Sequence, residues 1–508
     1  MNWKLVRFIF FKLPTHQTSR YFNRGNVLPS LWSHFLSKEG HAKTSNDKTS
    51  DDHMTVRQMR DVLLQSKLKR KSIGSKDILP ENLATDFVSF YKKIETKVEK
   101  LKLFNLLARD FGIDHQLIAD IAENLKSTKV NHDINSCLEL EEQLQNSLEP
   151  PSIVLLSYIG HLEGGVKFIV DLRSDLLELL SDRDVRGKGA ELNGLNQSIR
   201  HLLSMWFSVG FLKLERITWQ SPCDITEKVG NYEAVHQVRN WMDMKKRIGP
   251  YRRCYVFMHP SMPREPVCVL HIALRDEIPS DIKTILSEDV PNHEEDIERK
   301  TTAVFYSVSS TQKGLAEIDL GNSLIKEAVK ELRHDAPDVS TFVTLSPIPG
   351  FYRWFQSGMF QNSESSLISR IMDHESLTTE DKLTLEQFVK PPFDLNFKNF
   401  IDSPFWLRNN KIGELLKVPL MEICADYLYN EKKQGFAYDP VANFHLRNGA
   451  VLWRLNWKAD VSRNGALSSL GMMVNYKYEL NDLDENTRQY FLRGTVPVSA
   501  EFLKHLPQ

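Results

Sequence analysis

The stretch "TAVFYSVSSTQKGLAEIDLGNSLIKEAVKELRHDAPDVSTFVTLS", residues 302–346, decides the fold. It opens with a run of β-branched and aromatic residues typical of a buried strand, and "TFVTLS" at its end has the same character. Between them, "GNSLIKEAVKELRHD" has the apolar period of a helix. The stripe consists of Leu324, Ile325, Ala328, Val329 and Leu332. This order of elements predicts two parallel strands of a mixed α/β sheet.

The loop before that helix is a candidate phosphate site. Gly314 and Gly321 loosen its backbone, and we expect the helix to begin directly after Gly321 with Asn322 as its cap. Free N–H groups and the positive end of the helix dipole would then face a ligand, for which a pyrophosphate is the natural choice. The spacing matches neither a Walker A loop nor G-x-G-x-x-G, so an ordinary connection remains an alternative interpretation.

The second strand is expected to end at "SPIPG", residues 346–350, where two prolines restrict the backbone beside one hydroxyl. Parallel strands end at the same edge of a sheet, so Ser346 and the loop should open on the same side. We therefore predict that a ligand held by the loop extends toward Ser346. A serine that merely precedes a turn would have the same sequence pattern.

A histidine and two tyrosines farther along the chain could complete the site. In "DPVANFHLRNGAVLWRLNW", residues 439–457, His445 precedes a turn signal and a strand, and Asn443 lies two positions before it. Amide partners can hold an imidazole in one tautomer. In "GMMVNYKY", strand alternation puts Tyr476 and Tyr478 on one face. A structural histidine and packed phenols are the alternative.

The rest of the chain divides by composition. Residues 1–38 contain Lys and Arg but no Asp or Glu, which favours a mitochondrial presequence. Residues 39–56 are polar and are predicted to form a flexible linker. Helical periodicity fills residues 57–207, and the strand patterns lie in residues 208–508. The predicted class is α+β, with an N-terminal all-helical bundle domain followed by a mixed α/β catalytic domain.

Bulk composition excludes several classes of protein. The net charge is −1, which gives no support to a nucleic-acid or anionic-membrane partner. No apolar run reaches the roughly 18 residues of a transmembrane helix, so we expect no membrane insertion. None of the five cysteines forms a CxxC pair, which argues against structural zinc and a disulfide framework. Cys223 follows a proline and is a candidate exposed thiol.

Long segments of the chain resemble the malonyl-CoA decarboxylase family. They are "ERITWQSPCD", "VRNWMDMKKRIGPYRRCY", "FYSVSSTQKGLAEIDLGNSLIKEAVKEL", "TLSPIPGF", "DPVANFHLRNGAVLWRLNW" and "GMMVNYKY". The resemblance implies a helical domain followed by a catalytic domain that resembles Gcn5-related N-acetyltransferases. It also implies decarboxylation of malonyl-CoA to acetyl-CoA and CO2 in fatty-acid metabolism, with no cofactor or metal, by a homotetramer that assembles through its helical domain.

The resemblance also implies roles for individual residues. Ser346 and His445 match the family's catalytic serine and histidine, and Tyr478 matches an active-site tyrosine. Independently of the resemblance, we expect Asn443 to help Tyr478 orient the reacting group. The implied substrate-binding residues are Ala316, Glu317, Ile318, Asp319, Leu320, Gly321 and Asn322, together with Ser346 and His445. Asp319 stands where some members have Glu, which leaves its hydrogen-bonding role open.

Other functions and compartments stay open at this point. Ser346 could be the nucleophile of an acyl-CoA hydrolase, although no G-x-S-x-G elbow surrounds it. An acetyltransferase or a non-catalytic mitochondrial scaffold is also conceivable. The expected location is the mitochondrial matrix. A peroxisomal or cytosolic form is possible, although the chain ends in "HLPQ" rather than Ser-Lys-Leu.

Overall fold

The computed structural model describes residues 54–73, 81–130, 134–182, 189–287, 300–358, 367–389 and 393–507. They form two compact units that divide between Tyr158 and Ile159. The presequence predicted over residues 1–38 lies outside the described residues. So does the predicted linker up to residue 53, and Val56 at its end already opens a helix.

The N-terminal unit is helical. Its helices are α2 (Val56–Ile73), α3 (Glu81–Lys92), α4 (Lys97–Arg109), α5 (His115–Val130), α6 (Ile134–Ser147) and most of α7 (Pro151–Gly160). The start of α4 shows why they form: the Thr96 hydroxyl accepts the N–H of Glu99 at 3.2 Å, and Leu103 and Leu107 are fully buried on its inner face. No helix among the described residues is long and apolar enough to cross a membrane.

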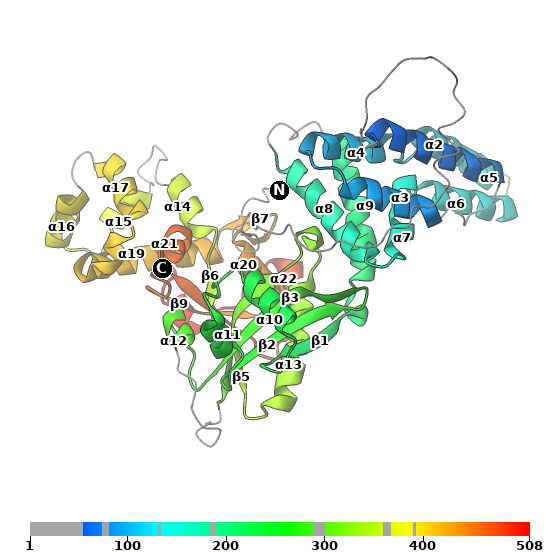
Figure 1. Cartoon of the computed structure of the whole chain (residues 1–508). Coiled ribbons are helices and arrows are strands. Elements are labelled where there is room, and N and C mark those ends of the chain that lie inside the picture. The colour runs from blue at the N-terminus through cyan, green and yellow to red at the C-terminus, as the bar shows by residue number, and fades with distance from the viewer. Residues whose placement is uncertain are drawn as a thin grey trace, which may run out of the picture. The chain divides into compact units, whose positions relative to one another are not determined.

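The second unit contains the sheet and the helices around it (Figure 1). The strands are β1 (Lys213–Ile217), β2 (Arg252–His259), β3 (Met262–Arg275), β4 (Thr302–Ser310), β5 (Thr341–Thr344), β6 (Ser346–Pro347), β9 (Val451–Asn456) and β10 (Met473–Lys477), with a separate hairpin of β7 (Lys432–Lys433) and β8 (Phe436–Ala437). The helices before β5 are α8 (Gly165–Leu180), α9 (Ala190–Trp206), η1 (Val209–Phe211), α10 (Cys223–Tyr232), α11 (Trp241–Arg247), α12 (Ile282–Leu286), η3 (Lys313–Leu315) and α13 (Leu320–Asp335). Those that follow are α14 (Phe351–Gly358), α15 (Leu367–Met372), α16 (Thr379–Val389), α17 (Phe393–Asp402), α18 (Phe405–Arg408), α19 (Asn410–Tyr429), α20 (Pro440–Arg447), α21 (Arg463–Ser469), α22 (Leu483–Arg493) and α23 (Ala500–Leu503).

The sheet is mixed. Its order is β1-β2-β3-β4-β5-β10-β6, and β9 also pairs with β10. β4 and β5 are parallel, with Phe305 opposite Thr344, and the other pairs are antiparallel. The strand–loop–helix–strand unit over residues 302–346 is therefore confirmed, and so is the predicted class of a helical region followed by a mixed α/β domain.

Two boundaries differ from the predictions. β5 ends at Thr344 rather than at Ser346, because the Thr344 carbonyl accepts the Asn475 side chain at 2.8 Å. Ser346 instead begins the short strand β6, opposite Val474 of β10. Helix α13 begins at Leu320, before Gly321, and its cap is Asp319, which accepts the N–H of Asn322 at 3.4 Å. The prediction of Asn322 as cap was wrong, because a carboxylate three residues earlier caps the helix.

A bulge in β4 separates two environments on the sheet. His271 of β3 pairs with Ser307 and the next residue, Ile272, pairs with Phe305, which leaves Tyr306 as the extra residue. Tyr306 packs in a core cluster with Ile282 and Ile285 of α12. Phe305 instead contacts the ring of Tyr478 edge-on at 6.2 Å, so that residue lies on the other face.

Candidate active site

Ser346 and His445 meet in the second unit, although 99 positions separate them in the chain. Ser346 Oγ lies 3.0 Å from His445 Nε2 and donates to Thr344 Oγ1 at 2.9 Å. Both side chains are buried, with 5% and 4% of their surface exposed. The prediction that they share one site is consistent with this contact.

The imidazole of His445 is held on several sides. Its Nδ1 lies 2.7 Å from the Tyr478 hydroxyl. The ring of Tyr476 stacks on it, with centroids 4.4 Å apart and planes 27° apart. Tyr476 lies in β10 and Tyr478 follows the end of that strand, and both contact His445, as expected if the two tyrosines lie on one face. His445 has little room to change its orientation.

One proton arrangement satisfies this chain of polar groups. Tyr478 donates to Nδ1, Nε2 donates to Ser346 Oγ, and Ser346 donates to Thr344. We assign this tautomer because each hydroxyl and each ring nitrogen then has one defined role. In this tautomer the proton of His445 is on Nε2, beside Ser346 Oγ. His445 can therefore donate a proton to a substrate that lies next to Ser346.

Burial determines the charge state of these groups. Desolvation lowers the pKa of His445 to about 3 and raises the pKa of the Tyr478 phenol well above its usual range. At neutral pH the imidazole is thus uncharged and the phenol is protonated. A neutral imidazole can donate from one nitrogen while it accepts at the other, which suits a proton relay.

The helix that carries His445 is α20, and Asp439 caps it. Asp439 Oδ1 accepts the N–H groups of Val441 and Ala442 at 2.9 and 3.0 Å. Pro440 follows at the first helical position, where its missing N–H costs nothing. Asn443 lies on the same helix, and its Oδ1 accepts the Tyr490 hydroxyl at 2.9 Å. That oxygen therefore contacts α22 rather than His445.

The start of α13 lies beside the helix of His445. A side chain at Gly321 would meet the ring of Phe444 at 3.3 Å and Val308 at 3.4 Å, so a glycine permits close packing there. Phe444 is the direct neighbour of His445. The predicted binding loop, residues 316–322, therefore approaches the predicted catalytic histidine. Within it, the side-chain oxygen of Asn322 is buried and has no hydrogen-bond partner among the described residues.

An arginine from α8 holds the loop in place. Arg173 is fully buried, and its Nη1 donates to the carbonyls of Gly314 and Ala316 at 2.5 and 2.8 Å. Glu317 has a left-handed backbone with φ of +71°, and its carboxylate lies 3.6 Å from Arg173 and 3.4 Å from Arg200 of α9. These two cations stabilise a strained turn of the loop.

Ile318 and Leu320 complete the loop geometry. The N–H of Ile318 donates to Leu315 at 3.1 Å, and the N–H of Leu320 donates to Ile318 at 3.0 Å. Leu320 is buried, which anchors the first turn of α13 in the core. The loop thus ends in a defined helix N-terminus, which Asp319 caps.

Sequence reasoning did not find Thr344, Asp439, Arg173 and Arg200. A signal existed for two of them. Asp439-Pro440 is a typical helix start, and Arg173 interrupts the apolar stripe of "KFIVDLRSDLLELL". Cys223, predicted to be exposed, is exposed at the start of α10.

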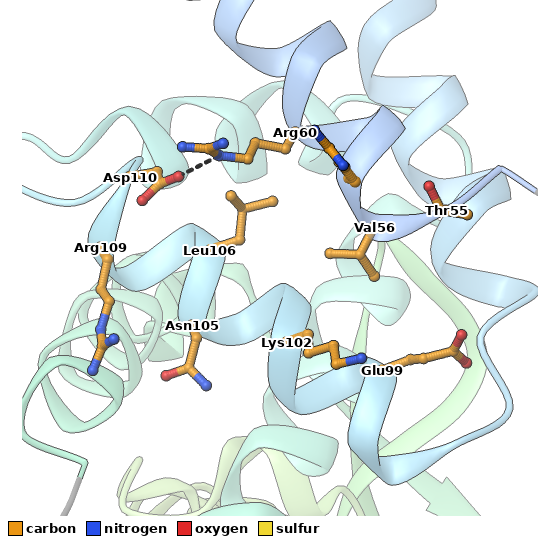
Figure 2. A pocket seen from close by; sticks show the side chains of 10 residues that line it. Thr55, Val56, Arg60, Glu99, Lys102, Asn105, Leu106, Arg109 and Asp110 are labelled. Atoms are coloured by element: carbon orange, nitrogen blue, oxygen red, sulfur yellow. Dashed lines mark hydrogen bonds and ion pairs between the residues drawn. The ribbon is translucent and has the colours of Figure 1, made fainter.

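One cavity among the described residues lies in the N-terminal unit, between α2 and α4 (Figure 2). Its volume is about 570 Å³, and the predicted site residues do not line it. Arg60 donates to Asp110 at 2.6 Å, and Arg57, Lys102 and Glu99 add charges of both signs. Because no candidate catalytic or binding residue lines this cavity, we assign it no role in the reaction.

Comparison with known proteins identifies the family of this chain. The model of the malonyl-CoA decarboxylase C-terminal domain matches residues 210–508, and that of the malonyl-CoA decarboxylase N-terminal domain matches residues 111–207. The chain belongs to the malonyl-CoA decarboxylase family. Membership makes it an enzyme of the carboxy-lyase class.

Relatives of the malonyl-CoA decarboxylase family support this over most of the chain. The mitochondrial malonyl-CoA decarboxylases of Anser anser anser and Rattus norvegicus are each 41% identical over 430 residues, which is 84% of this chain and 84% and 86% of theirs. The crystal structure of the malonyl-CoA decarboxylase from Rhodopseudomonas palustris matches with a TM-score of 0.71 and 32% identity over 89% of this chain and 100% of that one.

Proposed function

We propose that the chain converts malonyl-CoA to acetyl-CoA and CO2 with Ser346, His445 and Tyr478 as its catalytic residues. The observation that carries this is the hydrogen-bonded chain from Tyr478 through His445 to Ser346, beside the start of α13. The family supplies the reaction, and this geometry supplies groups that can perform it.

The binding loop, residues 316–322, would hold the CoA end of the substrate. The positive end of the α13 dipole attracts a phosphate, and the buried Asn322 oxygen can accept from a ligand. Asp319 takes one N–H of the first turn. The thioester would then extend past Phe444 toward His445 and Ser346.

Decarboxylation leaves an electron pair on the substrate, and the enzyme must stabilise it. The bond between the α-carbon and the carboxylate breaks, CO2 leaves, and the electron pair becomes an enolate of the thioester. A donor aimed at the enolate oxygen is worth roughly 3–4 kcal/mol, by analogy with hydrolase oxyanion holes. A buried site also favours the loss of a charged carboxylate, because that group is poorly solvated there. Ser346 would contact this carboxylate.

The α-carbon then takes a proton from His445 Nε2. As that proton leaves, Tyr478 supplies its own proton to Nδ1, so that no imidazolate accumulates, and water restores the phenol. Ser346 assists as the hydrogen-bond partner and relay, and Asn443 fixes the helix against α22. This sequence uses the tautomer of His445 that carries its proton on Nε2. A hydrolase would use the other tautomer, in which Nε2 accepts the Ser346 proton, and the reaction products distinguish the two.

We also propose a mitochondrial matrix location and a homotetramer that assembles through the helical region over residues 57–207. The relatives named above are mitochondrial forms, which supports the first point. Residues 1–38 would act as the transit peptide and be removed on import.

The test uses the purified full chain with malonyl-CoA labelled in its free carboxylate, without added metal or biotin, in D2O. We expect labelled CO2 and acetyl-CoA in equal amounts, with one deuterium in the methyl group. Free CoA as the main product would indicate a hydrolase, and transfer to an amine would indicate an acetyltransferase. A folded chain that makes no acetyl-CoA would contradict the proposal.

A further inference from the structure

The carboxylate of Asp439 connects the two segments that carry Ser346 and His445. It is 1% exposed. Its Oδ1 accepts the first N–H groups of α20, whereas its Oδ2 accepts the N–H of Gly350 at 3.1 Å and the hydroxyl of Tyr427 at 3.3 Å. Gly350 directly precedes α14 and ends the short segment that begins at Ser346 of β6. One carboxylate therefore serves the N-termini of two helices, and both helix dipoles favour its charge.

Short, stiff connections lead from this carboxylate to the reacting groups. Pro347 and Pro349 fix two φ angles between Ser346 and Gly350, so a shift of Gly350 is passed to the serine. On the other side, α20 carries His445 less than two turns from its cap. The distance between Ser346 Oγ and His445 Nε2 thus depends on how Asp439 holds both ends.

We propose that Asp439 is the positioning residue that fixes this distance, an inference that rests on the proposed function. The ionised carboxylate has an acceptor for each helix. Protonation turns one carboxylate oxygen into a donor, and that oxygen faces either an N–H group or a hydroxyl. The carboxyl group can then no longer accept hydrogen bonds from both α20 and Gly350. The two reacting side chains then separate or rotate.

This role makes activity sensitive to acid. Burial raises the pKa of Asp439 to about 6. The titratable groups that face it are Tyr427 and Cys424 of α19 and Tyr476 of β10, and burial raises the pKa of each, so they stay neutral. His445, with a pKa of about 3, keeps its charge state in this range. Activity should therefore fall below about pH 6 through Asp439.

Stability should not follow the same course. The pKa of Asp439 is higher in the folded chain than its ordinary value of 3.8. Between those two values the folded state binds more protons than the unfolded state, so acidification stabilises the fold through this group. Loss of activity without loss of folded protein is the signature of a positioning role.

The test compares Asp439→Asn with the parent enzyme in kcat and KM from pH 5 to 8. The amide keeps the volume and one acceptor for α20, but its nitrogen cannot accept from Gly350. We expect kcat at pH 7.5 to fall by about 10- to 100-fold, as a displacement near 1 Å can produce, while KM stays within about threefold. The fall in kcat below about pH 6, which we call the acid limb of the pH profile, should be absent in this variant. Tyr427→Phe should give a smaller loss and keep the limb.

A matched control is Asp281→Asn, which makes the same change at the cap of α12, where Asp281 accepts the N–H of Thr284 at 2.8 Å. Its kcat and pH profile should equal those of the parent. The inference is overturned if Asp439→Asn keeps the parent kcat or retains the acid limb, which would then belong to the substrate phosphate. If that variant does not fold, an unchanged kcat in Tyr427→Phe overturns it. A parent enzyme with no decarboxylation refutes the proposed function instead.

Discussion

Two buried histidines of the sheet domain differ in their partners and not in their burial. His445 has a hydroxyl at each ring nitrogen. His271 makes no hydrogen bond through either nitrogen among the described residues, lies 3.3 Å from Glu233 Oε2, and stacks on Tyr306 with centroids 5.9 Å apart. Burial lowers the pKa of both, to about 3 and about 4.

The difference shows which observation identifies a catalytic histidine. The carboxylate of Glu233 already accepts the Ser307 hydroxyl and the N–H groups of Val235 and His236. His271 therefore packs against a carboxylate that has other donors. His445 instead connects hydroxyl groups that can pass a proton. A low pKa is common to both sites, so the partners decide the role.

The largest effect should come from His445→Asn. Loss of the proton donor should lower kcat by about 10²–10⁴. Affinity for CoA, measured by calorimetry, should change by less than about threefold, because the binding loop is untouched. Near-parent turnover in this variant would show that His445 is not the proton donor and that it does not differ from His271 in function.

His271→Asn should act on stability instead. It leaves the buried Glu233 with fewer neighbours and opens space beside Tyr306, so we expect the free energy of unfolding to fall by about 1–3 kcal/mol. Urea denaturation measures this, and kcat of the folded fraction should stay within about twofold. A tenfold loss of kcat would show that the two sites are coupled across the sheet.

Tyr478→Phe removes the hydroxyl from His445 Nδ1 and keeps the ring packed on Phe305. The relay loses its second proton, and kcat should fall by about tenfold, at the low end of general-acid effects. Tyr306→Phe, which removes a hydroxyl with no hydrogen-bond partner among the described residues, is the matched control. Equal effects in the two variants would contradict the relay.

The smallest effect is a change in the pH dependence of stability. Both histidines have a folded pKa below the ordinary value of 6.5, so the unfolded chain binds more protons in that window and stability falls as pH is lowered through it. Each contributes about 1.4 kcal/mol per pH unit. His271→Asn and His445→Asn should each flatten the slope between pH 6 and 4.5 by about one proton. An unchanged slope would mean that the histidine is charged in the fold.

Sequence patterns predicted the elements well and the contacts poorly. The strands and helix of residues 302–346 were predictable because apolar periodicity reports burial. The start of α13 was not, because Asp319 and Asn322 are both good caps and packing of Leu320 chooses between them. Ser346 and His445 could be named as site residues from the resemblance. Their contact depends on Thr344, Asp439 and a break between β5 and β6, which local patterns do not encode.

Because Arg173 of α8 holds the binding loop, the region matched by the C-terminal family model depends on a helix outside that region. α8 and α9 fall in the stretch matched by the N-terminal family domain, yet they belong to the same compact unit as the sheet. A fragment that begins at residue 208 would keep Ser346, His445 and Tyr478. It would leave Glu317 in a left-handed turn without its two cations. Gene fusion or recombination at the family boundary would therefore separate the catalytic groups from the arginines that hold their own loop.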